Sequence, residues 1–205
     1  MKVIGLCGGS GAGKGYVCQR FKTYKFGVID TDRVYHGLLT EDSACARELV
    51  GEFGSDIILS GKVDRPRLAA TVFADKSGEM LKRLNEITHK HILARVRSML
   101  SDYEEQGFFA VIVDAPLLFE SGFDKECDFT VGVIADREIR MQRIIERDKI
   151  TREDAETRIN KQKSDEFILE NCDFIIVNNG DDLALDKSIA EVAVKILENG
   201  DLNYV

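Results

Sequence analysis

Short runs of consecutive apolar residues recur along the chain, and most of them end at a polar or glycine position. A strand buried on both faces of a parallel sheet shows such a run in place of strict alternation. Stretches with the periodicity of amphipathic helices separate the runs. The pattern therefore predicts an α/β fold with a five-stranded, mostly parallel sheet, whose strands cover residues 3–7, 26–29, 108–113, 129–134 and 174–177.

No convincing strand pattern occurs between the second and third predicted strands. Residues 33–105 show helical periodicity instead, interrupted by glycines and a proline. This pattern predicts a helical subdomain inserted into the α/β core. Its helix-like segments are residues 33–39, 41–53, 67–74 and 78–105.

The stretch between the first predicted strand and the helix that follows it is rich in glycine. Residues 8–15 read GGSGAGKG, which has the spacing of a phosphate-binding loop with Lys14 at the lysine position. Glycines let successive N–H groups converge on a phosphate, and a helix start adds the positive end of its dipole. The alternative, a glycine-rich turn without a ligand, is disfavoured because strand, spacing, lysine and helix all agree.

The loop departs from the usual pattern at its eighth position. Serine or threonine is expected there, to place a hydroxyl on Mg²⁺, whereas this chain has Gly15. The next residue, Tyr16, carries a hydroxyl on a longer arm and is one alternative source of the missing oxygen. The change weakens the inference of efficient Mg²⁺-dependent catalysis more than the inference of nucleotide binding.

Acidic residues follow two of the predicted strands directly. The second strand ends in Asp30-Thr31-Asp32, and the third ends at Asp114. Ligands of open α/β sheets bind at the carboxyl ends of the strands, so these carboxylates are expected near the phosphate loop. Asp114 fits the position that holds Mg²⁺ in P-loop proteins. Of Asp30 and Asp32, we expect one to cap the helix beginning near Arg33 and the other to act on a substrate.

A basic helical segment follows the fourth predicted strand. Arg140, Arg143 and Arg147 are spaced by three and four residues, so they share one helix face. In phosphoryl-transfer enzymes such a helix can act as a lid whose arginines stabilise transferred charge. The alternative is a structural role, in which these arginines pair with Glu146 and Asp148.

The composition is ordinary for a soluble globular protein of 205 residues, with 44% hydrophobic and 31% charged residues. No segment is long and apolar enough to span a bilayer, and the chain begins with a strand pattern instead of a signal peptide. The five cysteines are scattered, His36 is alone, and His89 and His91 are two apart. We therefore expect a cytoplasmic protein with reduced thiols and without a zinc site.

The net charge of −8 argues against general nucleic-acid binding. Residues 62–97 and 137–163 are nonetheless locally basic, and two such stretches in an acidic chain suit a polyanionic small ligand. Solvated helix faces of mixed charge are the better explanation for most of the individual residues.

Together the motifs resemble those of the dephospho-coenzyme A kinase family, over nearly the whole chain and in the family's order. The phosphate loop alone is shared by many unrelated enzymes, whereas LN-x-I-x-H at residues 84–89 and DAPLLFE at residues 114–120 are much more specific. The remaining matches are VIDTD at 28–32, G-x-V-D-R-x-x-L-A at 61–69, Q-R-x-x-x-R-D at 142–148, R-I-x-x-Q at 158–162 and N-x-G at 178–180.

The resemblance implies ATP-dependent phosphorylation of the 3′-hydroxyl of dephospho-coenzyme A, the last step of coenzyme A synthesis, with Mg²⁺ as cofactor. It implies a three-layer P-loop kinase fold. Its parts would be a nucleotide-binding core at residues 1–32, 106–136 and 171–205, a helical acceptor-binding subdomain at 33–105, and a helical lid at 137–170.

The resemblance also implies roles for individual residues. Asp32 is expected to be the base that orients the 3′-hydroxyl, with Asp114 as the metal ligand. Lys14, Arg143 and Arg147 complete the expected catalytic set. The ATP phosphates are expected on Gly11, Ala12, Gly13, Lys14, Gly15 and Tyr16, and the acceptor on Asp32, Arg65, Leu84, Asn85, His89, Leu117 and Leu118. No nucleic acid, membrane or obligate protein partner is implied.

Two positions depart from the family's pattern. Gly15 replaces the usual serine, and Lys90 replaces the proline that usually follows the histidine. Because proline restricts the residue before it, we expect Lys90 to change the start of the substrate-side helix. Two other functions stay open: a kinase of another small metabolite such as a nucleoside monophosphate, and a nucleotide-binding sensor that has lost catalysis. The retained Asp32, Asp114 and lid arginines argue against the sensor.

Overall fold

The computed structural model describes residues 1–201 and divides the chain into two units. The first unit combines Met1–Ile29 with the chain from Tyr103 onward, and the second is Asp30–Asp102. The predicted lid falls within the first unit. Among the described residues, no helix has both the length and the apolar character needed to cross a membrane.

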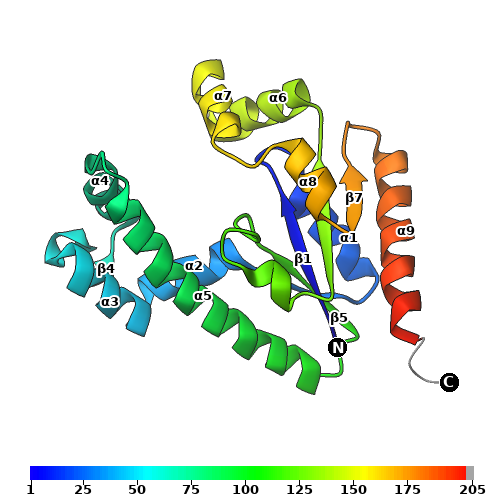
Figure 1. The fold of residues 1–205 in the computed structure, drawn as a ribbon, viewed down its shortest axis with the longest axis horizontal. Helices are drawn as coiled ribbons and strands as arrows, with labels where there is room; N and C mark the ends of the chain where they lie inside the picture. The colour runs from blue at the N-terminus through cyan, green and yellow to red at the C-terminus, as the bar shows by residue number, and fades with distance from the viewer. Residues whose placement is uncertain (202–205) are drawn as a thin grey trace. The chain divides into compact units, whose positions relative to one another are not determined.

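The first unit is built on a five-stranded sheet, as predicted, and the order of its strands is β2-β5-β1-β6-β7 (Figure 1). The pairings of β1 with β5 and β6, and of β6 with β7, are parallel. The central strand β1 therefore delivers the glycine-rich loop to the middle of the sheet's carboxyl edge. The strands are β1 (Lys2–Gly8), β2 (Gly27–Asp30), β5 (Ala110–Asp114), β6 (Phe129–Ile134) and β7 (Phe174–Val177).

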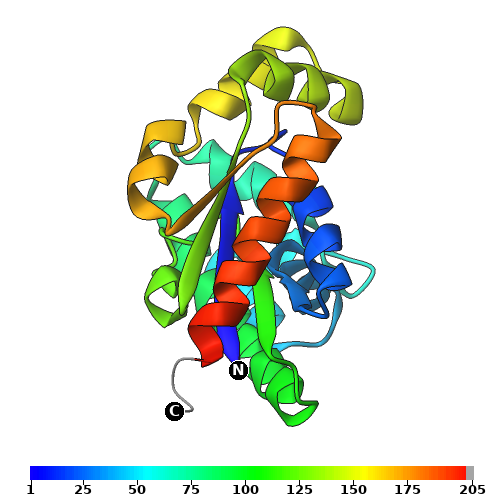
Figure 2. The ribbon, with the colours of Figure 1, turned by 90° about the vertical axis from the view of Figure 1, so that its right-hand side faces the viewer.

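Two helices cover one face of this sheet. Helix α1 (Lys14–Thr23) and helix α9 (Asp182–Asp201) share a core with apolar strand residues that include Ile4 and Leu6, both fully buried. Figure 2 shows α9 lying across the strands beside α1. The alternation of side chains along β1 thus directs every second residue into this helical layer.

The opposite face of the sheet is packed closely at two glycines. A Cβ at Gly5 would lie 2.8 Å from Leu118, and a Cβ at Gly132 would overlap Ile168 of helix α8 (Asp165–Asn171). A side chain at either position would push this third layer away from the sheet. Close packing on both faces establishes the three-layer α/β arrangement that the sequence predicted.

The segment predicted to be a lid is a helical hairpin followed by α8. Helix α6 (Arg137–Asp148) and helix α7 (Arg152–Asn160) share a small core that includes Met141 and Ile144 of α6, and Ala155 of α7. Burial of these side chains fixes which face of α6 points inward and leaves its arginine-bearing side for the phosphate loop.

The second unit is helical, as predicted, but it also contains a short hairpin. Its strands β3 (Ile58–Leu59) and β4 (Lys62–Val63) pair antiparallel, so the prediction of no strand in this region was wrong. A strand of two residues is too short to show the alternation of apolar and polar residues that predicts a strand. The helices are α2 (Thr31–Thr40), α3 (Ala44–Phe53), α4 (Arg65–Ala74) and α5 (Glu79–Glu105).

Helix α5 corrects the expectation for Lys90. It runs without interruption from Glu79 to Glu105, so Lys90 lies in its interior and not at a helix start. A proline there would lack the N–H that the helix needs and would clash with the preceding turn. Lysine supplies the N–H, and the helix continues through the position.

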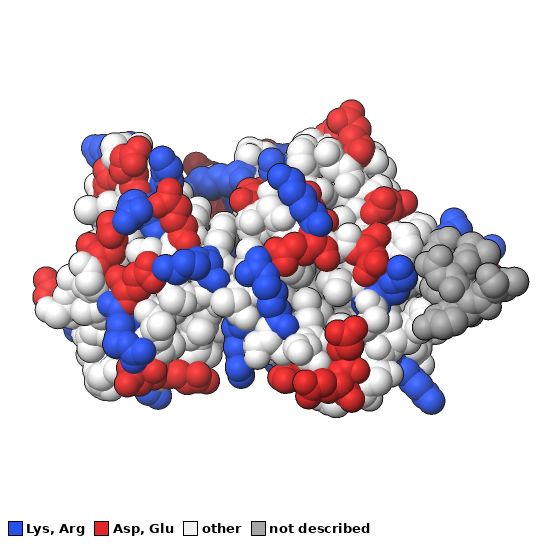
Figure 3. All heavy atoms as spheres, turned by 60° about the horizontal axis from the view of Figure 1, so that its bottom comes forward, with Lys and Arg blue, Asp and Glu red and all other residues white. Residues whose placement is uncertain are grey.

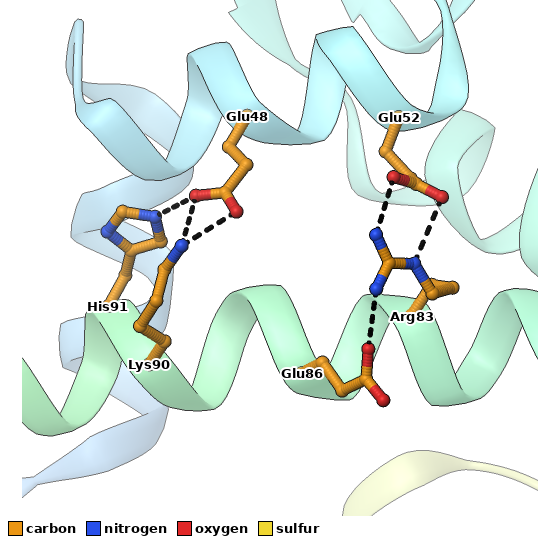
Figure 4. Close-up of polar contacts among 6 residues, drawn as sticks. All are labelled: Glu48, Glu52, Arg83, Glu86, Lys90 and His91. Atoms are coloured by element: carbon orange, nitrogen blue, oxygen red, sulfur yellow. Dashed lines mark hydrogen bonds and ion pairs between the residues drawn. The ribbon is translucent and has the colours of Figure 1, made fainter.

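The Lys90 side chain also joins two helices of the second unit. Its Nζ donates to both carboxylate oxygens of Glu48 on α3 at 2.7 Å, and His91 Nε2 lies 2.7 Å from Glu48 Oε2 (Figure 4). One turn further along α3, Glu52 accepts hydrogen bonds from Arg83. These contacts hold α3 against α5 on their polar side.

We expect this ion pair to make the stability of the second unit depend on pH. The hydrogen bonds from Lys90 and then His91 hold the pKa of Glu48 below its ordinary value of 4.5. A carboxyl group with a lowered folded-state pKa stabilises the fold above its unfolded pKa, and this contribution is lost as the pH falls through the folded pKa. Lys90→Met should therefore lower the urea midpoint slightly near neutral pH, and the difference should shrink below pH 4.5. Lys82→Met, on an exposed lysine of the same helix, is the control. A deficit that persists in acid would contradict the assignment.

Candidate active site

The glycine-rich loop connects β1 to α1 in a conformation that only glycine adopts readily. Gly11 and Gly13 have φ values of 80° and 98°, in the left-handed region. The loop is also packed tightly, since a Cβ at Gly13 would overlap the amide nitrogen of Asn178. That nitrogen donates to the carbonyl oxygen of Ala12 at 2.8 Å. The loop shape thus depends on two glycines and on a residue that follows β7.

The first turn of α1 presents its N-terminal end at this loop. Gly13 is the N-cap and has no side chain to accept from the first-turn N–H groups, and the first turn carries no acidic residue. The Lys14 ammonium folds back over the loop and donates to the carbonyl oxygen of Gly8 at 3.1 Å. A helix N-terminus and a lysine on the same loop form an electropositive site suited to an anion such as a phosphate.

Asp114 lies beside the loop at the end of β5. In the parallel register it is opposite Leu6 of β1, two residues before the loop begins. Its Oδ2 accepts a weak hydrogen bond from the thiol of Cys18, at 3.9 Å. The structure therefore brings an acidic side chain and the phosphate loop to neighbouring strand ends.

All three arginines on the shared face of α6 reach the phosphate loop. Arg140 Nε donates to the carbonyl oxygen of Ser10 at 3.1 Å, and Arg147 donates to the Ser10 hydroxyl at 3.1 Å. Arg143 donates to the carbonyl oxygen of Gly11 at 3.1 Å and to Asn178. The predicted common face is confirmed.

The alternative role of these arginines, ion pairing with acidic neighbours on the same helix, is confirmed for Arg147 and Asp148. Arg147 also donates to both carboxylate oxygens of Asp148, at 2.8 and 2.9 Å. These hydrogen bonds lower the pKa of Asp148 to about 2. Arg158 of α7 pairs with the same carboxylate. Arg147 is therefore both an ion-pair partner and a loop contact, whereas the contacts of Arg143 are to loop and turn oxygens.

A pocket of about 120 Å³ opens next to the first residues of the loop. Leu117 and Glu120 line it from the segment after β5, and Lys161 and Lys163 line it from the end of the lid. Leu118, predicted together with Leu117, is fully buried, so its side chain packs inside the core. The two lysines were not singled out from the sequence, although they belong to the basic stretch noted there.

The two aspartates where β2 meets α2, Asp30 and Asp32, have different structural roles. Asp30 is the N-cap, and its side chain accepts from the N–H of Arg33 at 3.1 Å. Asp32 lies in the first turn of the helix with an exposed side chain. One aspartate therefore caps the helix, as predicted, and Asp32 is left available for a substrate.

The other predicted acceptor residues of the second unit lie on α2, α4 and α5. Arg65 donates to His36 Nε2 and stacks over the ring of Tyr35, with 5.8 Å to its centroid. His36 is four residues from Asp32, on the same face of α2. His36 is therefore not isolated, and no sequence pattern predicted its contact with Arg65. Asn85 and His89 are half-buried one turn apart on α5, and Leu84 packs on the core of this unit.

Charge on the surface is mixed and not gathered into one field. On the face drawn in Figure 3, Lys and Arg lie interspersed with Asp and Glu. Residues of the basic stretches pair with acidic neighbours, as Arg137 does with Glu156 and Arg152 with Glu138. This supports the interpretation of most basic residues as solvated helix faces. Arg140, Arg143 and Arg147 of α6 differ from these residues because they also contact the phosphate loop.

A glycine-rich loop at the carboxyl edge of an α/β sheet, with a neighbouring helix whose arginines reach it, defines a phosphotransferase of the P-loop kinase class. The family model described as dephospho-CoA kinase matches residues 2–183. This chain therefore belongs to the dephospho-CoA kinase family.

Individual relatives agree with this assignment. A curated dephospho-CoA kinase of Fusobacterium nucleatum is 38% identical over 178 residues, which cover 86% of this chain and 89% of that one. The solved structure of dephospho-CoA kinase from Campylobacter jejuni has a TM-score of 0.70 at 25% identity and covers 98% of both chains. A crystal structure from Thermus thermophilus has a TM-score of 0.79 at 26% identity, over 95% of this chain and 97% of that one.

Proposed function

We propose that this chain transfers the γ-phosphoryl group of ATP to the ribose 3′-hydroxyl of dephospho-coenzyme A, which yields coenzyme A and ADP. The observation that carries the proposal is the convergence of Arg143 and Arg147 on the phosphate loop. A protein that only senses a nucleotide has no need of a lid that brings cationic groups to the outer phosphates. A kinase needs such groups, because negative charge spreads over the transferred phosphoryl group.

The ATP phosphates are assigned to the loop from Gly11 to Gly15. The backbone N–H groups at the start of α1 and the Lys14 ammonium would bind them. Tyr16 completes this set, and its hydroxyl donates to Asp186 on α9 at 3.1 Å, so the hydroxyl is engaged away from the loop. Its side chain thus anchors α1 to α9.

The acceptor is assigned to Asp32 and the residues of the second unit described above. Asp32 would accept a hydrogen bond from the 3′-hydroxyl, orient its oxygen and take its proton as the new bond forms. Arg65 of α4 supplies a positive charge beside His36, which lies one helical turn along α2 from Asp32. Asn85 and His89 supply polar groups on α5. Catalysis would then come from positioning and charge stabilisation, without a covalent intermediate.

Asp114 is the residue that would hold Mg²⁺. Mg²⁺ prefers oxygen ligands and keeps several waters, so one carboxylate together with phosphate oxygens fits its chemistry. Gly15 offers no hydroxyl, and the Tyr16 hydroxyl is engaged with Asp186. The residues present therefore fit the ion with one protein ligand fewer than usual. When bound, Mg²⁺ would neutralise charge on the phosphate oxygens.

Restoring the missing hydroxyl is expected to reduce the Mg²⁺ requirement. A Cβ at Gly15 would meet no atom within 4 Å, so serine fits without rearrangement. Gly15→Ser should lower the Mg²⁺ concentration for half-maximal rate, and it should stabilise α1 by up to about 0.5–1 kcal/mol. Gly15→Ala is the matched control, since it gives the same helix stabilisation without an oxygen. An equal Mg²⁺ dependence in both variants would exclude this position from metal binding.

Acceptor specificity tests the proposed function. In a coupled assay of ADP release, dephospho-coenzyme A should support turnover at low acceptor concentration, while nucleoside monophosphates should not. A nucleoside monophosphate as the better acceptor would indicate the other small-metabolite kinase. If no acceptor stimulates ADP release at any Mg²⁺ concentration and Gly15→Ser restores it, the wild-type chain is the nucleotide sensor.

A further inference from the structure

Arg140 differs from the other two lid arginines in its burial. Its side chain is only 4% exposed, compared with 59% for Arg147. Burial of a guanidinium is unfavourable unless its charge and its N–H groups find partners. The partners of Arg140 therefore indicate what the residue does.

The Arg140 guanidinium donates to three different groups. Nε donates to the Ser10 carbonyl oxygen at 3.1 Å, Nη1 pairs with Asp165 of α8 at 2.9 Å, and Nη2 donates to Gln162 Oε1 at 3.1 Å. One partner is on the phosphate loop, and the others follow α7 and begin α8. The residue is thus the junction between the loop and the end of the lid.

Gln162 completes a closed ring around Ser10. The same Oε1 that accepts from Arg140 accepts from the Ser10 N–H, at 2.9 Å. Lid residues therefore hold both the N–H and the carbonyl oxygen of Ser10. Because both backbone groups are fixed, the peptide planes on either side of Ser10 are oriented by the lid.

The neighbouring glycines fit tightly against Arg140. A Cβ at Gly9 would overlap the Arg140 guanidinium, and a Cβ at Gly11 would lie 2.5 Å from the Arg140 carbonyl oxygen. The loop approaches the arginine on both sides of Ser10. Glycine at these two positions permits a contact that any other residue would prevent.

Arg143 and Arg147 are placed differently. Arg143 contacts the loop through the Gly11 carbonyl oxygen, and Arg147 contacts it through the Ser10 hydroxyl. Both are more exposed than Arg140, and neither takes part in the ring around Ser10. They are the arginines left to face a phosphoryl group.

We propose that Arg140 is a positioning residue that sets the phosphate loop for nucleotide, through the ring it forms with Gln162 and the backbone of Ser10. Asp165 balances its charge. This inference rests on the proposed function. Because it concerns ATP binding, it can be tested without an acceptor. Arg140 itself does not contact the phosphates while the ring is intact.

The test compares ATP affinity, measured by calorimetry on the full chain, with stability in urea. Arg140→Met should weaken ATP binding about tenfold or more, since the loop donors lose their fixed geometry. It should also lower stability, because Asp165 loses its partner. The variant carrying both Arg140→Met and Asp165→Asn should regain stability but keep the weakened ATP binding. Arg137→Met, on an exposed arginine of α6 that pairs with Glu156, is the control and should leave both unchanged.

Gln162→Leu is a second substitution that removes hydrogen bonds of the same ring. It should weaken ATP binding, and adding Arg140→Met should weaken it little further, because both changes open one network. ATP affinity that is unchanged in Arg140→Met, or restored together with stability by Asp165→Asn, would overturn the proposal. Loss of ATP affinity in these variants, in a chain that fails to phosphorylate dephospho-coenzyme A, would uphold the proposal and overturn the proposed acceptor.

Discussion

Lys14→Ala is expected to reduce phosphoryl transfer by about 10²–10³-fold or more, because the Lys14 ammonium is held over the phosphate loop. Its Nζ donates to the Gly8 carbonyl oxygen in this structure, and bound phosphates would offer it stronger, charged acceptors. The measurement is the initial rate of ADP formation with dephospho-coenzyme A.

The fold should survive this change. Lys14 is the first residue of α1, and the buried residues of that helix are Val17, Cys18 and Phe21. Circular dichroism and the urea midpoint should therefore stay close to those of the wild type. Lys22→Ala, on an exposed lysine in the last turn of the same helix, is the control for loss of a positive charge. Near-normal transfer by a folded Lys14→Ala protein would refute the assignment of this loop.

Asp32→Asn is expected to lower kcat by about 10²–10⁴-fold, the range typical of a positioned general base, with a much smaller effect on ATP affinity. The amide keeps the size of the side chain but cannot take the proton of the 3′-hydroxyl. A rate profile against acceptor concentration separates the loss in kcat from any change in KM.

The neighbouring aspartate supplies a matched control for this experiment. Asp30→Asn removes a carboxylate two residues away, yet asparagine caps helices about as well as aspartate. The hydrogen bond from the Arg33 N–H should persist, and activity should change little. If Asp30→Asn is the damaging change and Asp32→Asn the mild one, the roles that we assign to the two carboxylates are reversed.

Much of the fold could be predicted because its main signals are local. Strands buried on both faces require continuous apolar runs, and residues 108–113 show one that is followed by Asp114. The β3–β4 hairpin could not be predicted, because each strand has two residues and no periodicity. The helical periodicity of residues 78–105 predicted α5 as one helix, whereas the comparison with the family's proline wrongly placed a helix start at Lys90.

Site residues could be predicted where they lie close together in one segment of the sequence. The phosphate loop and the spacing of Arg143 and Arg147 are contained in short motifs. The contacts of Gln162 and Asn178 with the loop join residues more than 150 positions apart, which no local pattern reveals. The pairing of His36 with Arg65 depends on how α2 and α4 pack. Burial of Leu118 beside exposed Leu117 likewise follows from the close approach of a segment to Gly5.

The most direct test of the proposed function is to determine which oxygen of the acceptor carries the new phosphate. After incubation with ATP and dephospho-coenzyme A, the acceptor product can be isolated and examined by phosphorus NMR, with ADP and inorganic phosphate measured in the same sample. The proposed function predicts one phosphate on the ribose 3′-oxygen for each ADP formed and little free phosphate, because Asp32 would orient that hydroxyl for the transfer. A phosphate on another oxygen, or ADP accompanied by inorganic phosphate and unchanged acceptor, would contradict it.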